Sequence, residues 1–225
     1  MLKKIKILFL SLLFNTFACS PVHPKAKCIN SIDPPVKSYV KIFTRVIIKE
    51  CTKEKKKDTN CPVGQYVSSG SGINIKLLNG TATVLTAGHV CNMPIHPKVT
   101  KFSRSVEVED INGSIHQAWV ILSSLANSKG SPDMCVLWVP SLEGPSVQFS
   151  KKAPKAGDFV YYIGSPAGVF HPPTAPIFSG HYSGNVDAST SMSSVPAMGG
   201  SSGSSLLSNE GKVIGVIWAV HPKFH

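Results

Sequence analysis

Short segments in which apolar and polar residues alternate make up most of the chain beyond residue 38, with glycine- and proline-rich turns between them. This period is that of β-strands, and many of the segments are rich in β-branched residues. In the first half they cover 39–49, 65–67, 72–78, 81–86, 106–111, 114–122 and 134–139. In the second half they cover 158–163, 177–183, 190–195, 204–207 and 212–219. Since long helical periodicity is absent after the N-terminus, we predict an all-β protein.

The segment 140–156, rich in proline, glycine and lysine, separates the two groups of strands. The first group has about six strands, enough for one barrel, and the dipeptides Asn79-Gly80 and Asn112-Gly113 mark hairpin turns within it. We therefore expect an N-terminal β-barrel over 38–148 and a C-terminal β-barrel over 149–225.

The first 18 residues differ from the rest: three lysines precede an apolar run at 7–14 and small residues follow it. This pattern predicts a secretory signal peptide at 1–18, because the run is too short to span a bilayer comfortably. Residues 19–37 read as an irregular linker. Cys19 opens this linker, and two interpretations stay open: ordinary cleavage before Cys19, or a lipid on Cys19 that attaches the protein to the cell envelope. We expect a secreted or periplasmic protein.

Six cysteines in an exported chain indicate an oxidising compartment and disulfides. Cys51 and Cys61 flank a charged loop, and a bridge between them would close it. Zinc is the alternative use of cysteine with histidine, but the chain has no CxxC or HxxxH spacing. We therefore expect no metal.

The chain carries a formal net charge of +11, and the segment 53–57 contains four lysines. Such a run is typical of a solvated loop, and attraction to an anionic envelope surface is the alternative. No module that reads RNA or DNA accompanies it, so no nucleic-acid partner is expected.

Three stretches carry candidate chemistry. His89 follows the apolar strand 81–86, Asp133 opens the apolar strand 134–139, and residues 197–206 contain four serines and three glycines. By composition alone the last stretch would be a flexible linker. The order His, Asp, Ser along the chain, however, is that of the chymotrypsin-type catalytic triad.

With these motifs the chain resembles the trypsin-like serine peptidases of the PA clan, and within them the bacterial HtrA/Deg-like branch without a PDZ domain. The sequence SGSGI at 69–73 is similar to that branch's opening before the histidine strand. KAGDFVYYIGSPAG at 155–168 and GSSGSSL at 200–206 are similar to its later motifs. The resemblance extends over residues 38 to 220. It implies two six-stranded Greek-key barrels and a serine endopeptidase that acts on protein or peptide substrates without a cofactor.

The resemblance also implies the roles of the site residues. Ser202 would be the nucleophile, His89 the general base and Asp133 the group that orients the imidazole. The backbone N–H groups of Gly200 and Ser202 would form the oxyanion hole.

If this triad forms, it brings Cys91 and Cys135 near each other, because each lies two residues beyond a triad member. A disulfide between them is therefore expected.

Substrate recognition is expected to involve Pro196, Met198, Trp218 and His221. Pro196 stands where a trypsin-like enzyme would carry its pocket carboxylate, so we predict an apolar or small residue before the scissile bond. His221 leaves an acidic preference open.

Two departures from the family matter. Ser201 stands where many animal members have the aspartate that pairs with a newly cut N-terminus, so this zymogen switch is not expected. The chain ends at His225, soon after the strand that carries Trp218, so two alternatives stay open: the second barrel is truncated by a strand, or the tail is trimmed. The alternatives left open are a catalytically inactive protease-fold binding protein and an exported lipoprotein.

Overall fold

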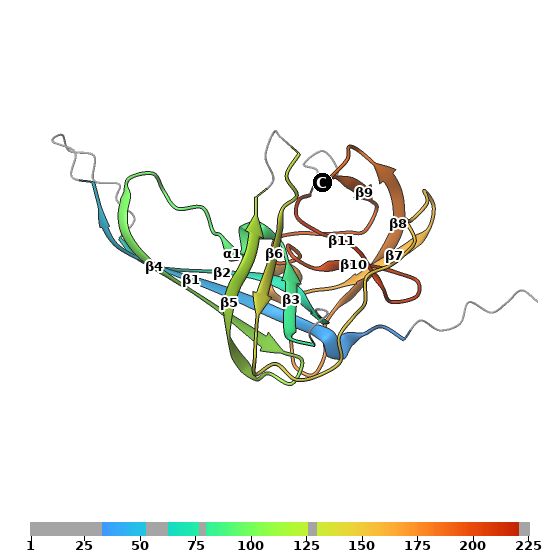
Figure 1. Cartoon of the computed structure of the whole chain (residues 1–225), viewed down its shortest axis with the longest axis horizontal. Coiled ribbons are helices and arrows are strands. Elements are labelled where there is room, and N and C mark those ends of the chain that lie inside the picture. The colour runs from blue at the N-terminus through green and yellow to red at the C-terminus, as the bar shows by residue number, and fades with distance from the viewer. Residues whose placement is uncertain (1–32, 53–62, 77–79, 126–129, 221–225) are drawn as a thin grey trace, which may run out of the picture. The chain divides into compact units, whose positions relative to one another are not determined.

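Two antiparallel β-sheets form the part of the chain described by the computed structural model, which is residues 33–52, 63–76, 80–125 and 130–220. In Figure 1 the strands of the first sheet run from blue to yellow-green and those of the second from orange to red. The predicted signal peptide and most of the predicted linker lie outside the described residues. The boundaries proposed for the segments and barrels therefore stay predictions.

The first sheet is a closed six-stranded barrel with the strand order β1-β2-β3-β6-β5-β4. Its strands are β1 (Tyr39–Cys51), β2 (Gly64–Lys76), β3 (Ala82–Thr86), β4 (Val99–Asp110), β5 (Ile115–Ser124) and β6 (Met134–Trp138). Alternation along β1 explains the barrel interior, since Val40, Ile42, Thr44 and Val46 are buried while Lys41, Phe43 and Arg45 between them are more exposed. Full burial of one such side chain contributes about 1.5–3 kcal/mol. The predicted first barrel is confirmed.

The second sheet has the strand order β11-β10-β7-β8-β9. Its strands are β7 (Phe159–Ile163), β8 (Ile177–Asn185), β9 (Ser191–Ser193), β10 (Ser205–Ser208) and β11 (Val213–Val216). We expected six strands or a truncated barrel. The described residues form a curled sheet of five strands that stays open, because the three-residue β9 pairs only with β8. Among the described residues the second sheet therefore has fewer strands than a six-stranded barrel.

A shared apolar cluster holds the two sheets together. It joins Tyr39 and Leu85 of the first barrel with Tyr161, Leu207 and Val213 of the second sheet. The crossover between the sheets follows this contact, forming isolated bridges first with β2 and then with β11. The two short helices that matter for the site are α1 (Gly88–Cys91), after β3, and the 3-10 helix η2 (Pro166–Gly168), after β7. No helix in the described ranges has the length and apolar character needed to cross a membrane.

Candidate active site

His89 lies on α1, a single helical turn that begins where β3 ends. Two threonine hydroxyls fix this turn to the barrel. Thr86 donates to the carbonyl oxygen of Ser71 at 2.7 Å, and Thr44 donates to the carbonyl oxygen of Val90 at 2.6 Å. The imidazole is thus carried by an anchored backbone, and its side chain remains 34% exposed.

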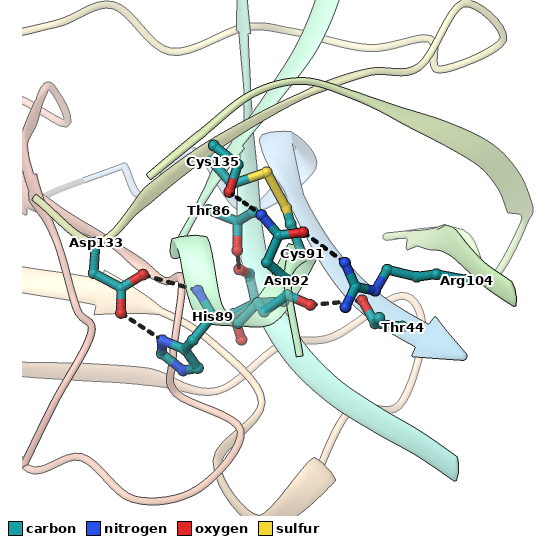
Figure 2. Close-up of a disulfide and its surroundings, with 11 residues drawn as sticks. Thr44, Thr86, His89, Cys91, Asn92, Arg104, Asp133 and Cys135 are labelled. Atoms are coloured by element: carbon teal, nitrogen blue, oxygen red, sulfur yellow. Dashed lines mark hydrogen bonds and ion pairs between the residues drawn. A yellow bond between two sulfur atoms is a disulfide. The ribbon is translucent and has the colours of Figure 1, made fainter. Parts of the chain in front are cut away.

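Asp133 immediately precedes β6 and holds His89 through both carboxylate oxygens. Its Oδ2 lies 2.8 Å from His89 Nδ1, and its Oδ1 accepts the backbone N–H of His89 at 2.8 Å (Figure 2). The side chain of Asp133 is only 6% exposed. A carboxylate at Nδ1 places the imidazole proton on that nitrogen, which leaves Nε2 as the ring atom able to accept a proton.

Gly88 allows this contact. A Cβ atom at this position would overlap the carbonyl oxygen of Ser124 and lie 2.6 Å from Asp133 Oδ1. A residue with a side chain would therefore push the aspartate away from His89. We did not single out Gly88 from the sequence, although its place directly before the histidine is the signal that could have identified it.

The expected disulfide between Cys91 and Cys135 is present, with a Cα–Cα distance of 6.5 Å (Figure 2). It joins α1 to β6 beside the His89–Asp133 pair. Cys51 is also disulfide-bonded. Its expected partner Cys61 lies outside the described residues, so that pairing stays a prediction.

Removing the Cys91–Cys135 bridge should destabilise the fold. The bridge closes a loop with a sequence separation of 44, and a crosslink of this length contributes about 3–4 kcal/mol. We expect the double variant Cys91→Ala, Cys135→Ala to lose about this much free energy of unfolding in urea titrations. An unchanged unfolding midpoint would contradict the expectation.

The Ser202 loop lies between β9 and β10, and four successive carbonyl groups in it are hydrogen-bonded. The N–H of Ala167 donates to the Gly199 oxygen at 2.6 Å and the N–H of Ser204 donates to the Ser201 oxygen at 3.0 Å. The remaining two carbonyls are held from the first barrel by a single residue. The hydroxyl of Ser71 donates to the Gly200 oxygen at 2.9 Å, and the N–H of Ser71 donates to the Ser202 oxygen at 2.8 Å.

Glycine is required twice in this loop because both positions have positive φ. Gly200 has a φ of 93° and Gly203 a φ of 85°, which other residues adopt only with strain. A Cβ at Gly200 would overlap the carbonyl oxygen of Ser165, and one at Gly203 would overlap Thr86 Oγ1 and the Ser71 carbonyl oxygen. The Gly- and Ser-rich stretch is therefore a packed loop and not a linker.

The loop is brought to the histidine by close packing. Gly203 lies against Thr86 and Ala87, the residues that lead into α1, and Gly70 lies close to both the Val90 side chain and the Ser202 carbonyl.

Among the described residues no hydrogen bond joins the His89 ring to the Ser202 hydroxyl. Such bonds are often long in the absence of substrate.

The N–H groups of Gly200 and Ser202 have no protein acceptor in the described part of the chain. The N–H of Ser201, which lies between them, donates to the Met198 oxygen at 2.9 Å. The loop therefore has two free donors at the positions expected for an oxyanion hole.

A cavity of about 120 Å³ adjoins Ser202. It is lined by Met198, Gly199, Ser201, Ser202, Ile217, Trp218, Ala219 and Val220. Of the residues expected to bind substrate, Met198 and Trp218 are therefore at the cavity. Pro196 does not line it; its carbonyl oxygen accepts the Tyr162 hydroxyl at 2.7 Å. His221 lies outside the described residues.

Ser201 is buried on the far side of the loop from solvent, and its partners are uncharged. Its hydroxyl lies 3.2 Å from the Tyr162 hydroxyl and 3.3 Å from the backbone nitrogen of Met198. Burial raises the pKa of Tyr162, and the hydrogen bond with Ser201 lowers it by a smaller amount. Ser201, which by resemblance stands where many animal enzymes have an aspartate, is thus part of a neutral pair with Tyr162.

Comparison with known proteins gives two findings. A family model described as a trypsin-like peptidase domain matches residues 70–216, more than half of the chain. Among solved structures, the crystal structure of the Rv3671c protease from M. tuberculosis in its active form is similar with a TM-score of 0.56 and 21% sequence identity. That similarity covers 85% of this chain and 76% of the other. A search of curated proteins gives no significant match.

The two kinds of finding establish different things. At this level of identity the similar structure supports the fold, a closed barrel followed by a curled second sheet of the chymotrypsin type. The HtrA/Deg-like branch stays a prediction. The family model itself covers the positions of His89, Asp133 and Ser202. The chain therefore belongs to the family of trypsin-like peptidases, and it is a hydrolase of the serine-protease class.

Proposed function

We propose that this protein is an active endopeptidase that cleaves peptide bonds through an acyl-enzyme formed on Ser202. In this proposal His89 Nε2 takes the proton of the Ser202 hydroxyl as its oxygen attacks the substrate carbonyl carbon. The protonated imidazole then gives that proton to the leaving amine as the peptide C–N bond breaks. Water, activated by the same nitrogen, releases the acyl group and restores the serine.

The observation that carries the proposal is the double contact between Asp133 and His89. A buried carboxylate that binds both the backbone and the ring of one histidine fixes the ring orientation and stabilises the imidazolium formed during the reaction. Asp133 engages only Nδ1 of a ring that remains 34% exposed, which leaves Nε2 to act on Ser202.

The two free donors of the Ser202 loop support the second part of the proposal. The N–H groups of Gly200 and Ser202 would bind the negatively charged oxygen of the tetrahedral intermediate. One such donor is worth about 3–4 kcal/mol of the activation barrier. The carbonyl in the same peptide group as each donor, that of Gly199 or Ser201, is already hydrogen-bonded. Little reorganisation of the loop is therefore needed when negative charge develops on the substrate oxygen.

A fluorophosphonate probe tests this function directly, because it reacts with serines activated by a neighbouring base. We expect the folded protein to be modified at one residue, with the adduct mapped to Ser202 by peptide mass spectrometry. Absence of an adduct on the folded protein would favour the alternative of an inactive protease-fold binding protein. Pretreatment with heat provides the control, since the unfolded chain should not react.

The cavity beside Ser202 supports a preference for an apolar or small residue before the scissile bond. In the described residues its lining contains no charged side chain, and its volume of about 120 Å³ suits a side chain of modest size. In a series of peptides that differ only at this position, we expect kcat/KM to be highest for alanine, valine or leucine. Arginine and lysine should be cleaved at least about 100-fold more slowly, because their charge would have no partner. A preference for glutamate or aspartate would instead indicate that His221 takes part.

Export of the enzyme is the third part of the proposal. The Cys91–Cys135 disulfide supports it, because such bridges are typical of proteins in oxidising compartments. The signal peptide at 1–18 and the lipid on Cys19 remain predictions from the sequence.

A further inference from the structure

Ser71 of β2 makes an unusual set of contacts across the two sheets. It is fully buried, and both its N–H and its hydroxyl bind carbonyl oxygens of the Ser202 loop, which belongs to the second sheet. The backbone contact, to the Ser202 oxygen at 2.8 Å, is available to any residue except proline. The hydroxyl contact, to the Gly200 oxygen at 2.9 Å, depends on the side chain.

The direction of this second bond is set by a third group. Ser71 Oγ accepts the backbone N–H of Ser165 at 3.0 Å, and Ser165 Oγ lies farther away, at 3.3 Å. A serine hydroxyl has one proton to donate, and the carbonyl oxygen of Gly200 can only accept one. The hydroxyl of Ser71 is therefore held on one side by Ser165 and donates on the other side to Gly200.

This bond fixes the peptide group that joins Gly200 to Ser201. A trans peptide group is planar, so its C=O and N–H point in opposite directions. The N–H of Ala167 holds the Gly199 oxygen at 2.6 Å and so directs the N–H of Gly200 away from η2. The Ser71 hydroxyl holds the following carbonyl, that of Gly200 itself. Both peptide groups beside the flexible Gly200, which has a φ of 93°, are thereby fixed.

We propose that Ser71 is a positioning residue of the oxyanion hole: its hydroxyl fixes the peptide group that joins Gly200 to Ser201, so that the N–H groups of Gly200 and Ser202 on either side of it stay directed at the substrate carbonyl oxygen. The inference rests on the proposed function, since it concerns the geometry of the same site. Ser71 would not touch the substrate. Its contribution appears only when the oxyanion forms, because the Gly200 N–H is more strongly engaged by a negatively charged oxygen than by a neutral carbonyl.

The test is the variant Ser71→Ala, measured beside Ser165→Ala. Loss of one oxyanion donor lowers kcat by about 100- to 1000-fold, and a misdirected donor should cost less. We expect Ser71→Ala to lower kcat about 10- to 100-fold with KM changed less than about threefold. Ser165→Ala is the matched control, because it removes a serine hydroxyl with the same burial from the same cluster but leaves the bond to Gly200 in place. Its kcat should stay within about threefold of the unaltered enzyme.

A second readout separates positioning from general destabilisation. A peptide boronic acid forms a tetrahedral adduct that occupies the oxyanion hole, and its affinity should fall by about the same factor as kcat in Ser71→Ala. Thermal unfolding of each variant shows that the comparison is made on folded protein. If Ser71→Ala does not fold, Ser71→Cys keeps the size of the side chain, weakens the donor and should show a smaller loss in the same direction.

The outcomes distinguish the two proposals. Labelling of Ser202 by fluorophosphonate in the unaltered enzyme, with an unchanged kcat and boronic acid affinity in folded Ser71→Ala, would overturn the role of Ser71 alone. Equal losses of kcat in Ser71→Ala and Ser165→Ala would also overturn it, since the bond to Gly200 would then be irrelevant. An unaltered enzyme that neither reacts with the probe nor cleaves peptides would overturn the proposed function and this inference with it.

Discussion

Replacement of Ser202 by alanine should lower kcat by about 10⁵- to 10⁶-fold, the largest effect expected for any single substitution in this protein. The nucleophilic oxygen disappears, and the acyl-enzyme route is closed. Stability should change little, because among the described residues the hydrogen bond of Ser202 is made by its backbone carbonyl, which accepts the N–H of Ser71. Peptide hydrolysis under single-turnover conditions measures the loss, and thermal unfolding should give the same midpoint as the unaltered protein.

Three other serines stand close to Ser202 in the chain and serve as controls. Ser201, Ser204 and Ser205 are all buried, whereas Ser202 is half-buried, so Ser202 is the most accessible of the four serines to substrate. Ser204→Ala should keep both probe labelling and most of its activity. If Ser202→Ala retained labelling while Ser204→Ala or Ser201→Ala lost it, the nucleophile would have been assigned to the wrong residue.

A methyl group at Gly203 should be the most damaging change to the fold of the site. Gly203 has a φ of 85°, and its Cβ would overlap Thr86 Oγ1 and the carbonyl oxygen of Ser71. Backbone strain and overpacking together are expected to cost Gly203→Ala about 3–4 kcal/mol of unfolding free energy. Because the clash pushes the Ser202 loop away from α1, activity should fall at least 1000-fold at temperatures where the variant is still folded, an order-of-magnitude expectation for a displaced nucleophile.

Gly211 provides the matched comparison. It also has a positive φ, 73°, but a Cβ there would meet no atom nearer than 3.4 Å. Gly211→Ala should therefore lose only the unfolding free energy that backbone strain costs, about 1 kcal/mol, and its kcat should be unchanged. Urea titrations of the two variants give the difference. Equal destabilisation would mean that the contact between Gly203 and the first barrel does not hold the loop in place.

Strands were predictable wherever alternation was strong. The run 39–49 corresponds to β1 and 134–139 to β6, with differences of one or two residues at their ends. The predicted strands 65–67 and 72–78 are instead parts of one strand, β2. The serines and glycines between them suggested a break, but pairing of this segment with β1 continues through Ser68, Ser69, Gly70 and Ser71. Tertiary pairing here overrides local propensity.

In the candidate site, too, some features were predictable from the sequence and others were not. The positions of His89 and Asp133 follow from strand ends, which a sequence marks clearly, and the structure brings these two residues together. The contacts of Ser71, Tyr162 and Ala167 with the Ser202 loop could not be derived, because they join residues of different elements through backbone oxygens. No residue pattern encodes which carbonyl a distant donor will reach.

The neutral hydrogen bond between Tyr162 and Ser201 has a consequence for engineering. Because Ser201 carries no charge and burial raises the pKa of Tyr162, these two groups present no ionisation near neutral pH to disturb the loop. Its shape should then be insensitive to added salt, since neutral partners are not screened. Affinity tags or fused reporter proteins placed after the predicted signal peptide should be tolerated without removal before assay, because this contact needs no free amino terminus.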